Sequence, residues 1–215
     1  MNKLFLLFLL LISFNFSEAQ ISALTETGKQ VILYDNGTWK YSDSLVNNSD
    51  RSDSIPINSL KFSKSPGASF LVKSTTVNMG IYLDPNKWTF ATHRDNEVNP
   101  EYRFTLKSGN GMAMLETEKT PVELESMRNI ALINAQKAAV DAKITSEEYR
   151  MVNNKKILCM EMSGTIQGIK FKYIGYYYSN KRGTTQLLSF TTEAIYPGAR
   201  KDLETSLGRA SCRAR

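Results

Sequence analysis

The chain has 215 residues, of which 41% are hydrophobic and 22% are charged, a balance that is typical of a globular protein and excludes a disordered or fibrous one. The formal net charge is +6, and three arginines in the segment 209–215 contribute to it, so the rest of the chain carries 6 − 3 = +3. The other Lys and Arg residues are interleaved with acidic ones, whereas nucleic-acid-binding proteins concentrate basic charge on one face, so no nucleic-acid partner is expected. The sequence has no Cys/His cluster suited to zinc, and no metal or cofactor is expected.

Residues 1–19 have the pattern of a secretory signal peptide. Lys3 precedes an apolar run at 4–14, and Ser17 and Ala19 place small residues at the −3 and −1 positions of a cleavage site. The run is shorter than the roughly 20 residues that a membrane-spanning helix needs, although a retained anchor is the alternative reading. We therefore expect a periplasmic or secreted protein that is cleaved near Ala19 and has no transmembrane segment after cleavage.

The mature chain is expected to begin with a small β-hairpin at residues 20–41. The pair Asn36-Gly37 joins two runs of strand-forming side chains, and both residues tolerate the positive φ angles that a tight hairpin turn requires. Residues 42–60 then change in composition, because Ser, Asp and Asn dominate them. Such a segment buries too little apolar surface to offset the entropy of ordering, so it is predicted to be a flexible linker.

The main domain is expected at residues 61–208, followed by an irregular basic tail at 209–215. Its first half contains runs of strand-forming side chains bounded by turn residues, which predict strands at 68–74, 75–83, 88–92, 102–107 and 112–117. One long helix follows. Thr120 is predicted as its N-cap, Glu123 completes a capping box, and an apolar stripe continues to about Ala142.

The last third of the chain is dense in Ile, Leu, Phe, Tyr and Thr. After a short strand or extended lead-in at 149–152, it predicts three strands at 155–165, 169–180 and 184–194. The joints between these strands are tight, which implies an antiparallel meander because parallel strands need a long crossover. A short closing helix is predicted at 200–207.

This order of elements predicts the α+β class, because few helices separate the strands. The central strand, 169–180, has apolar side chains on both of its faces, so both faces of the sheet need a cover. We therefore expect an antiparallel β-sheet flanked by helices, an α/β/α sandwich, with the small β-hairpin preceding it. The long helix would cover one face, and the closing helix with the early loops would cover the other.

The C-terminal hundred residues resemble the Mog1/PsbP-like α/β/α sandwich. The resemblance rests on the long helix, the segment NNKKILCMEMSG (153–164), the Gly-centred turn into IKFKYIGYYYS, the return TTQLLSFTTE (184–193) and the last helix. It implies an antiparallel sheet flanked by helices, and a binding or accessory role rather than catalysis. No functional residues of that family match this chain residue by residue.

A cluster of tyrosines forms the candidate binding surface, because each tyrosine combines a large apolar area with a polar tip. Basic residues near the cluster, and a tryptophan in the hairpin, complete the candidate set: Tyr173, Tyr176, Tyr177, Tyr178, Lys172, Arg182 and Trp39. The alternative is that the tyrosines fill the core on one face of the sheet and lie under a helix on the other.

These observations predict an exported, non-enzymatic binding or accessory protein of the bacterial cell envelope, whose partner is an envelope protein or polymer of unknown identity. Two alternatives stay open. One is a carrier that encloses a small apolar ligand between sheet and helix. The other is a hydrolase that uses His93, the single histidine; Cys159 is a poor nucleophile for it, since apolar neighbours raise the pKa of a thiol.

Overall fold

The computed structural model describes residues 21–25, 30–41, 55–62, 64–92 and 100–207. The predicted signal peptide, the basic tail and most of the predicted linker lie outside these residues. The chain divides into two compact units, residues 1–48 and 49–215, and each is described by itself.

The first unit is a three-stranded antiparallel sheet. Its strands are β1 (Ile21–Leu24), β2 (Gln30–Leu33) and β3 (Trp39–Tyr41). β2 and β3 are joined at the predicted Asn-Gly turn, where Gly37 has a φ of 78° and its N–H donates to the carbonyl of Tyr34. β1 pairs with the other side of β2 and was not predicted.

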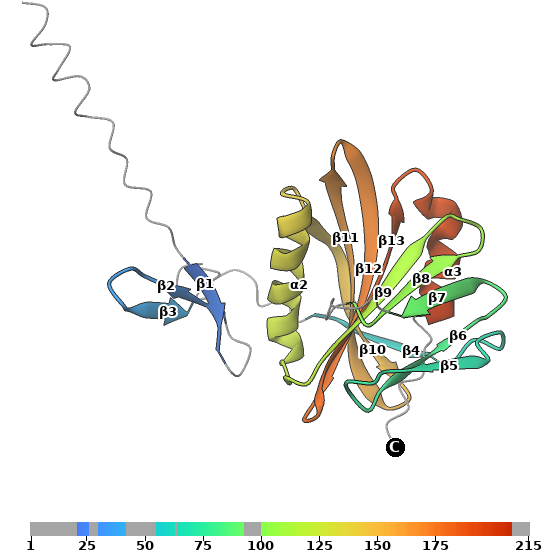
Figure 1. Cartoon of the computed structure of the whole chain (residues 1–215), viewed down its shortest axis with the longest axis horizontal. Coiled ribbons are helices and arrows are strands. Elements are labelled where there is room, and N and C mark those ends of the chain that lie inside the picture. The colour runs from blue at the N-terminus through green and yellow to red at the C-terminus, as the bar shows by residue number, and fades with distance from the viewer. Residues whose placement is uncertain (1–20, 26–29, 42–54, 63, 93–99, 208–215) are drawn as a thin grey trace, which may run out of the picture. The chain divides into compact units, whose positions relative to one another are not determined.

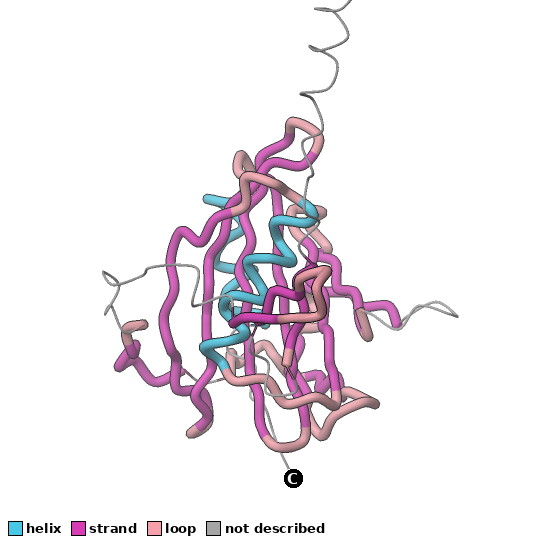
Figure 2. The backbone as a smooth tube through the Cα atoms, turned by 90° about the vertical axis from the view of Figure 1, so that its left-hand side faces the viewer, coloured by secondary structure: helices cyan, strands magenta, loops and turns pink. Residues whose placement is uncertain are grey.

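In the described part of the second unit, eight strands form one large sheet in the order β4-β10-β11-β12-β13-β9-β8-β7 (Figure 1). Their bounds are Ile57–Phe62 (β4), Trp88–Thr92 (β7), Tyr102–Leu106 (β8), Met112–Glu118 (β9), Lys143–Val152 (β10), Lys155–Ile166 (β11), Ile169–Asn180 (β12) and Gly183–Thr192 (β13). The predicted meander is formed by β11, β12 and β13, which pair antiparallel in sequence order. Figure 2 shows these long strands with the helices alongside them.

The edge strand β4 corrects two predictions. It pairs in parallel with β10, so the sheet is mixed rather than purely antiparallel. Residues 57–60 belong to this strand, so the prediction of a flexible linker is wrong for them. The cause is long-range pairing, because Tyr149 donates its N–H to the carbonyl of Pro56 and Asn58 donates its side-chain amide to Glu148. Parallel strands need such a distant connection.

Two helices are present in the described part of this unit: α2 (Leu124–Ala138) and α3 (Tyr196–Leu207). The predicted N-cap of α2 is wrong, since the helix begins after Glu123, which makes no side-chain capping bond. The N–H of Val122 is bound instead by the hydroxyls of Ser179 and Thr184 on the sheet. These bonds attach the segment before α2 to β12 and β13, so the helix begins only after that segment.

The two helices lie on opposite sides of the large sheet (Figure 1). α2 contacts β10, β11 and β12, and its Met127 and Ala131 share a buried cluster with Leu158, Met160 and Tyr177. α3 contacts β13 and β12, and Leu203 lies fully buried in the larger cluster on the other side. The unit is thus an α+β domain with a core on each face of its sheet.

A separate two-stranded sheet completes the second core. It consists of β5 (Phe70–Lys73) and β6 (Gly80–Leu83), whose Val72, Ile81 and Leu83 are buried against the large sheet. The Glu101 carboxylate ties this hairpin to β9, because it accepts hydrogen bonds from Ser74 (2.8 Å), Thr75 and Thr117 (2.6 Å).

Candidate binding surface

The structure divides the predicted tyrosine cluster between the two cores. Tyr177 is fully buried in the cluster under α2, and Tyr176 is 6% exposed in the cluster on the opposite face. Successive residues of a strand point to opposite faces, and both faces are covered at this position. Tyr176 and Tyr177 are therefore core residues, and placing them on a binding surface is incorrect.

The other predicted residues of the second unit are not brought together either. Tyr178 is half-buried with the ammonium of Lys155 above its ring, and Lys172 pairs with Glu193 at 3.7 Å. Arg182 is exposed in the turn between β12 and β13. Trp39 belongs to the first unit, where it is 53% exposed and its ring contacts Tyr41 edge-on at 5.2 Å. Only Tyr173, half-buried on the α2 side of β12, adjoins the surface described below.

A polar cluster on the α3 side is structural. The Arg150 guanidinium bonds to the carboxylate of Glu148 and, at 3.2 Å, to the hydroxyl of Tyr176. Cys159 lies beside them, and burial raises the pKa of its thiol to about 12. A thiol in that state is not a nucleophile near neutral pH. His93, the residue of the hydrolase alternative, lies outside the described residues.

The α2 side of the sheet carries an apolar area that the helix does not cover. α2 packs on β10, β11 and β12, while the same side of β13 and β9 continues beyond it. Cross-strand pairing places Phe190 beside Met112 and Leu188 beside Met114, and Tyr173 extends the first row onto β12. Leu188 lies at the border of this area, since it also packs against the cluster under α2. We call the following residues the open face: Phe171, Tyr173, Leu188, Phe190, Met112 and Met114.

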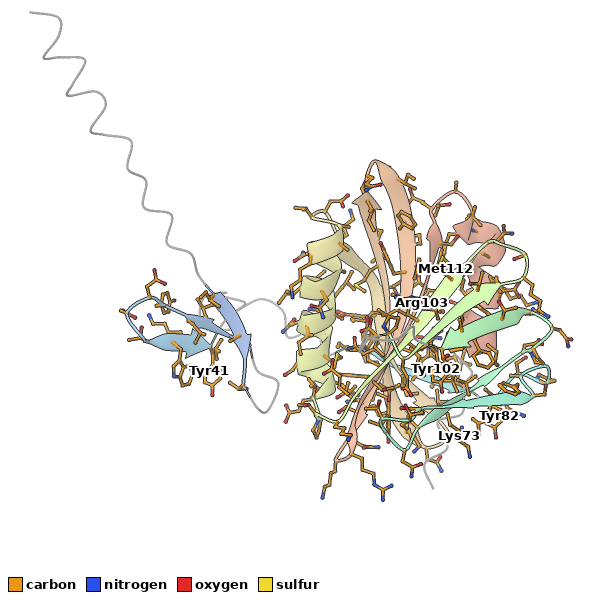
Figure 3. The ribbon with its side chains drawn as sticks, viewed as in Figure 1. Tyr41, Lys73, Tyr82, Tyr102, Arg103 and Met112 are labelled. Carbon is orange, nitrogen blue, oxygen red and sulfur yellow. The ribbon has the colours of Figure 1, made fainter. Side chains whose placement is uncertain are left out.

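The open face is accessible and apolar. Met112 is 45% exposed and the other members are half-buried. Three of its aromatic rings form a ladder, with centroids 6.2 Å apart for Phe171 and Tyr173 and 6.0 Å apart for Tyr173 and Phe190. Figure 3 marks Met112 on β9 and Arg103 on the neighbouring strand β8. A rigid aromatic ladder next to adaptable methionines is typical of a protein-binding surface.

Charged side chains border the open face. Arg103 on β8 stands opposite Met114. Glu116 and Glu118 lie further along β9, on the same side of the sheet as Met112 and Met114. Burial, followed by the neighbouring Glu118 carboxylate, raises the pKa of Glu116. Among the described residues, none makes a hydrogen bond or ion pair with the Glu116 carboxylate. Within the part of the chain that the structure describes, Glu116 is therefore a half-buried carboxylate without a hydrogen-bonding or ionic partner.

Sequence reasoning did not find the open face because its residues are dispersed over three strands. Met112 and Met114 carried no functional signal, since alternating apolar residues in a hairpin indicate core packing first. A usable signal was the width of the sheet relative to its helices. One long helix covers only a few strands spaced about 4.8 Å apart, so a wide sheet leaves strands uncovered.

Comparisons with known proteins identify the fold. The solution structure of cyanobacterial PsbP (CyanoP) from Synechocystis sp. PCC 6803 is similar to this chain with a TM-score of 0.51 and 10% identity, over 66% of this chain and 91% of that one. The domain therefore has a Mog1/PsbP-like fold, as the sequence resemblance implied.

A protein of unknown function, PA94 from Pseudomonas aeruginosa, also matches, with a TM-score of 0.40 and 8% identity over 63% of this chain and 90% of that one. No protein-family model matches the chain, and no curated protein sequence matches it. Within the described residues, no helix is both long enough and apolar enough to cross a membrane, and no group of His, Cys, Asp and Glu could hold a metal ion.

Proposed function

We propose that this chain is a non-enzymatic binding or accessory protein of the bacterial cell envelope, and that it contacts a partner protein through the open face. In this proposal the domain is an α/β/α sandwich whose α2 layer is incomplete. The partner supplies the missing cover over β13 and β9.

The observation that carries the proposal is the exposure of Met112 within a continuous apolar area. A sheet face that is apolar normally lies against another layer. Phe190 and Met112 stand side by side on this face beyond the reach of α2. Contiguous exposed apolar areas on a folded protein mark interaction sites.

Export is supported by the sequence pattern of residues 1–19, and it has its own test. The full chain, expressed in a bacterium with a periplasm, is expected in the periplasmic or released fraction with a mature N-terminus at Gln20. N-terminal sequencing of the purified protein measures this directly. A cytoplasmic protein that retains Met1 would contradict the proposed location.

Site-specific photo-crosslinking tests the binding role. A photoreactive amino acid at Met112 is expected to give a defined crosslinked product with an envelope protein. The same group at the exposed residue Asn86, in the turn before β7, is the matched control and should give none. The crosslinked protein is then purified, and Met112→Asp is expected to weaken its binding at least tenfold. Equal crosslinking at both positions, or unchanged binding by the variant, would refute the open face.

One observation favours the carrier function as a second candidate, for a ligand whose apolar body also carries hydrogen-bonding groups. Three polar atoms in the core on the α3 side are buried without a hydrogen-bond partner among the described residues: Trp88 Nε1, Thr185 Oγ1 and Ser189 Oγ. Buried polar groups in native proteins are normally bonded to protein, water or a ligand. Native mass spectrometry of the gently purified chain tests this. A bound small molecule that denaturation releases would support the carrier, and a mass equal to that of the polypeptide would oppose it.

A further inference from the structure

The dimensions of the uncovered area match one α-helix. The strands β13, β9 and β8 lie about 4.8 Å apart, so together they span about 10 Å across the sheet. A helix with its side chains is about 10 Å in diameter, and packed helices lie about 8–10 Å apart. A second helix thus fits beside α2 on the same face of the sheet.

The length of the area sets the spacing of the contacts. Met112, Met114 and Glu116 alternate along β9, so Met112 and Glu116 lie about 13 Å apart along the strand. On a helix, residues eight positions apart are separated by about 12 Å. A helix with apolar side chains at i and i+4 and a third contact at i+8 therefore reaches from Met112 to Glu116.

Charge decides the chemistry of that third contact. Glu116 is half-buried beside the apolar rows, and within the described residues its carboxylate has no partner. Glu118, two residues further along β9, adds a second negative charge on the same side, while Arg103 lies one row away opposite Met114. A half-buried carboxylate without a counter-charge is unfavourable, and a cation from a partner would relieve it.

We propose that the open face binds an amphipathic helix of a partner protein, whose apolar side chains cover Met112, Met114 and Phe190 and whose Lys or Arg pairs with Glu116. This inference rests on the proposed binding function and adds the chemistry of the partner segment.

Two synthetic helical peptides test it. Both carry Leu at i and i+4, and they differ only at i+8, which is Lys in one and Glu in the other. Fluorescence anisotropy with the mature chain is expected to show at least tenfold tighter binding of the Lys peptide, because a close charge pair at an interface contributes that much. Glu116→Gln should remove the preference, and Glu116→Lys should reverse it. Glu118→Gln is the matched control, since Glu118 is exposed, and should keep most of the preference.

The outcomes separate this inference from the proposed function. Equal binding of both peptides, abolished by Met112→Asp, would overturn the basic partner and leave the open face as a binding site. Binding of neither peptide would also overturn the basic helix, and photo-crosslinking at Met112 would then decide the open face alone. Binding to anionic vesicles in place of the Lys peptide would reject a protein partner. The urea midpoint of each variant shows that it is folded.

Discussion

Replacing Tyr177 by phenylalanine is expected to stabilise the protein. Tyr177 is fully buried under α2, and its hydroxyl has no hydrogen-bond partner among the described residues. The ring lies back over Gly175, where an added Cβ would stand 2.4 Å from that hydroxyl. A buried hydroxyl without a partner costs about 1–3 kcal/mol. Tyr177→Phe removes that cost and keeps the packed ring, so we expect a gain of about 1 kcal/mol.

The neighbouring Tyr176 is the matched control, because the same substitution there should have the opposite sign. Its hydroxyl accepts a hydrogen bond of 3.2 Å from Arg150. Tyr176→Phe removes a bond to a charged group and should cost about 1.5–3 kcal/mol. Urea unfolding measures the free energy of unfolding of both variants. In thermal unfolding, each kcal/mol should change the Tm by about 2–4 °C for a domain of this size. A loss of stability in Tyr177→Phe would show that its hydroxyl has a partner and refute the reasoning.

Three further predictions concern other parts of the domain. Burial raises the pKa of Glu101, but the hydrogen bonds it accepts outweigh burial and lower the pKa overall. The stability that the Glu101 carboxylate contributes is therefore complete above the ordinary pKa of a carboxyl, and it is lost as the pH falls through the lowered pKa. The difference in free energy of unfolding between wild type and Glu101→Gln should accordingly shrink below about pH 4. Gly164→Ala should cost about 1–3 kcal/mol in urea unfolding, because the new Cβ would stand 2.8 Å from that of Ala139; no loss would show that the helix can shift. In a Cys212→Ser background, Cys159 should resist iodoacetamide at pH 8 until urea unfolds the chain, and rapid labelling of the native protein would contradict its burial.

The meander could be predicted because its signals are local. Strand-forming runs separated by short polar joints leave one solution, an antiparallel pairing in sequence order, and β11, β12 and β13 adopt it. Tight joints connect them, with positive φ at Gly168 in the first turn and at Gly183, the first residue of β13. The Mog1/PsbP-like fold could be predicted for the same reason, because most of the sequence segments that resemble it lie in this third of the chain.

The elements that were missed depend on distant residues. β4 follows a Ser/Asp/Asn-rich segment and has no regular alternation of apolar residues, and its pairing with β10 makes it a strand. β10 itself runs for ten residues, although only 149–152 were predicted, because its first half alternates weakly and is held by β11. The start of α2 is set by hydroxyls on Ser179 and Thr184, more than fifty residues away. No local propensity encodes such contacts.

Tyr176 and Tyr177 do not belong to a surface, for one physical reason. A run of tyrosines along one strand alternates between two faces, so the cluster that is most conspicuous in sequence is divided in space. Tyr176 and Tyr177 each enter a different core, while Met112 and Phe190, which are 78 residues apart, become neighbours through the pairing of β9 with β13. A surface on a sheet is assembled across strands, not along them. The width left uncovered by α2 therefore decides which residues of this side are exposed, and these are residues of the open face, whereas Tyr176 and Tyr177 are buried.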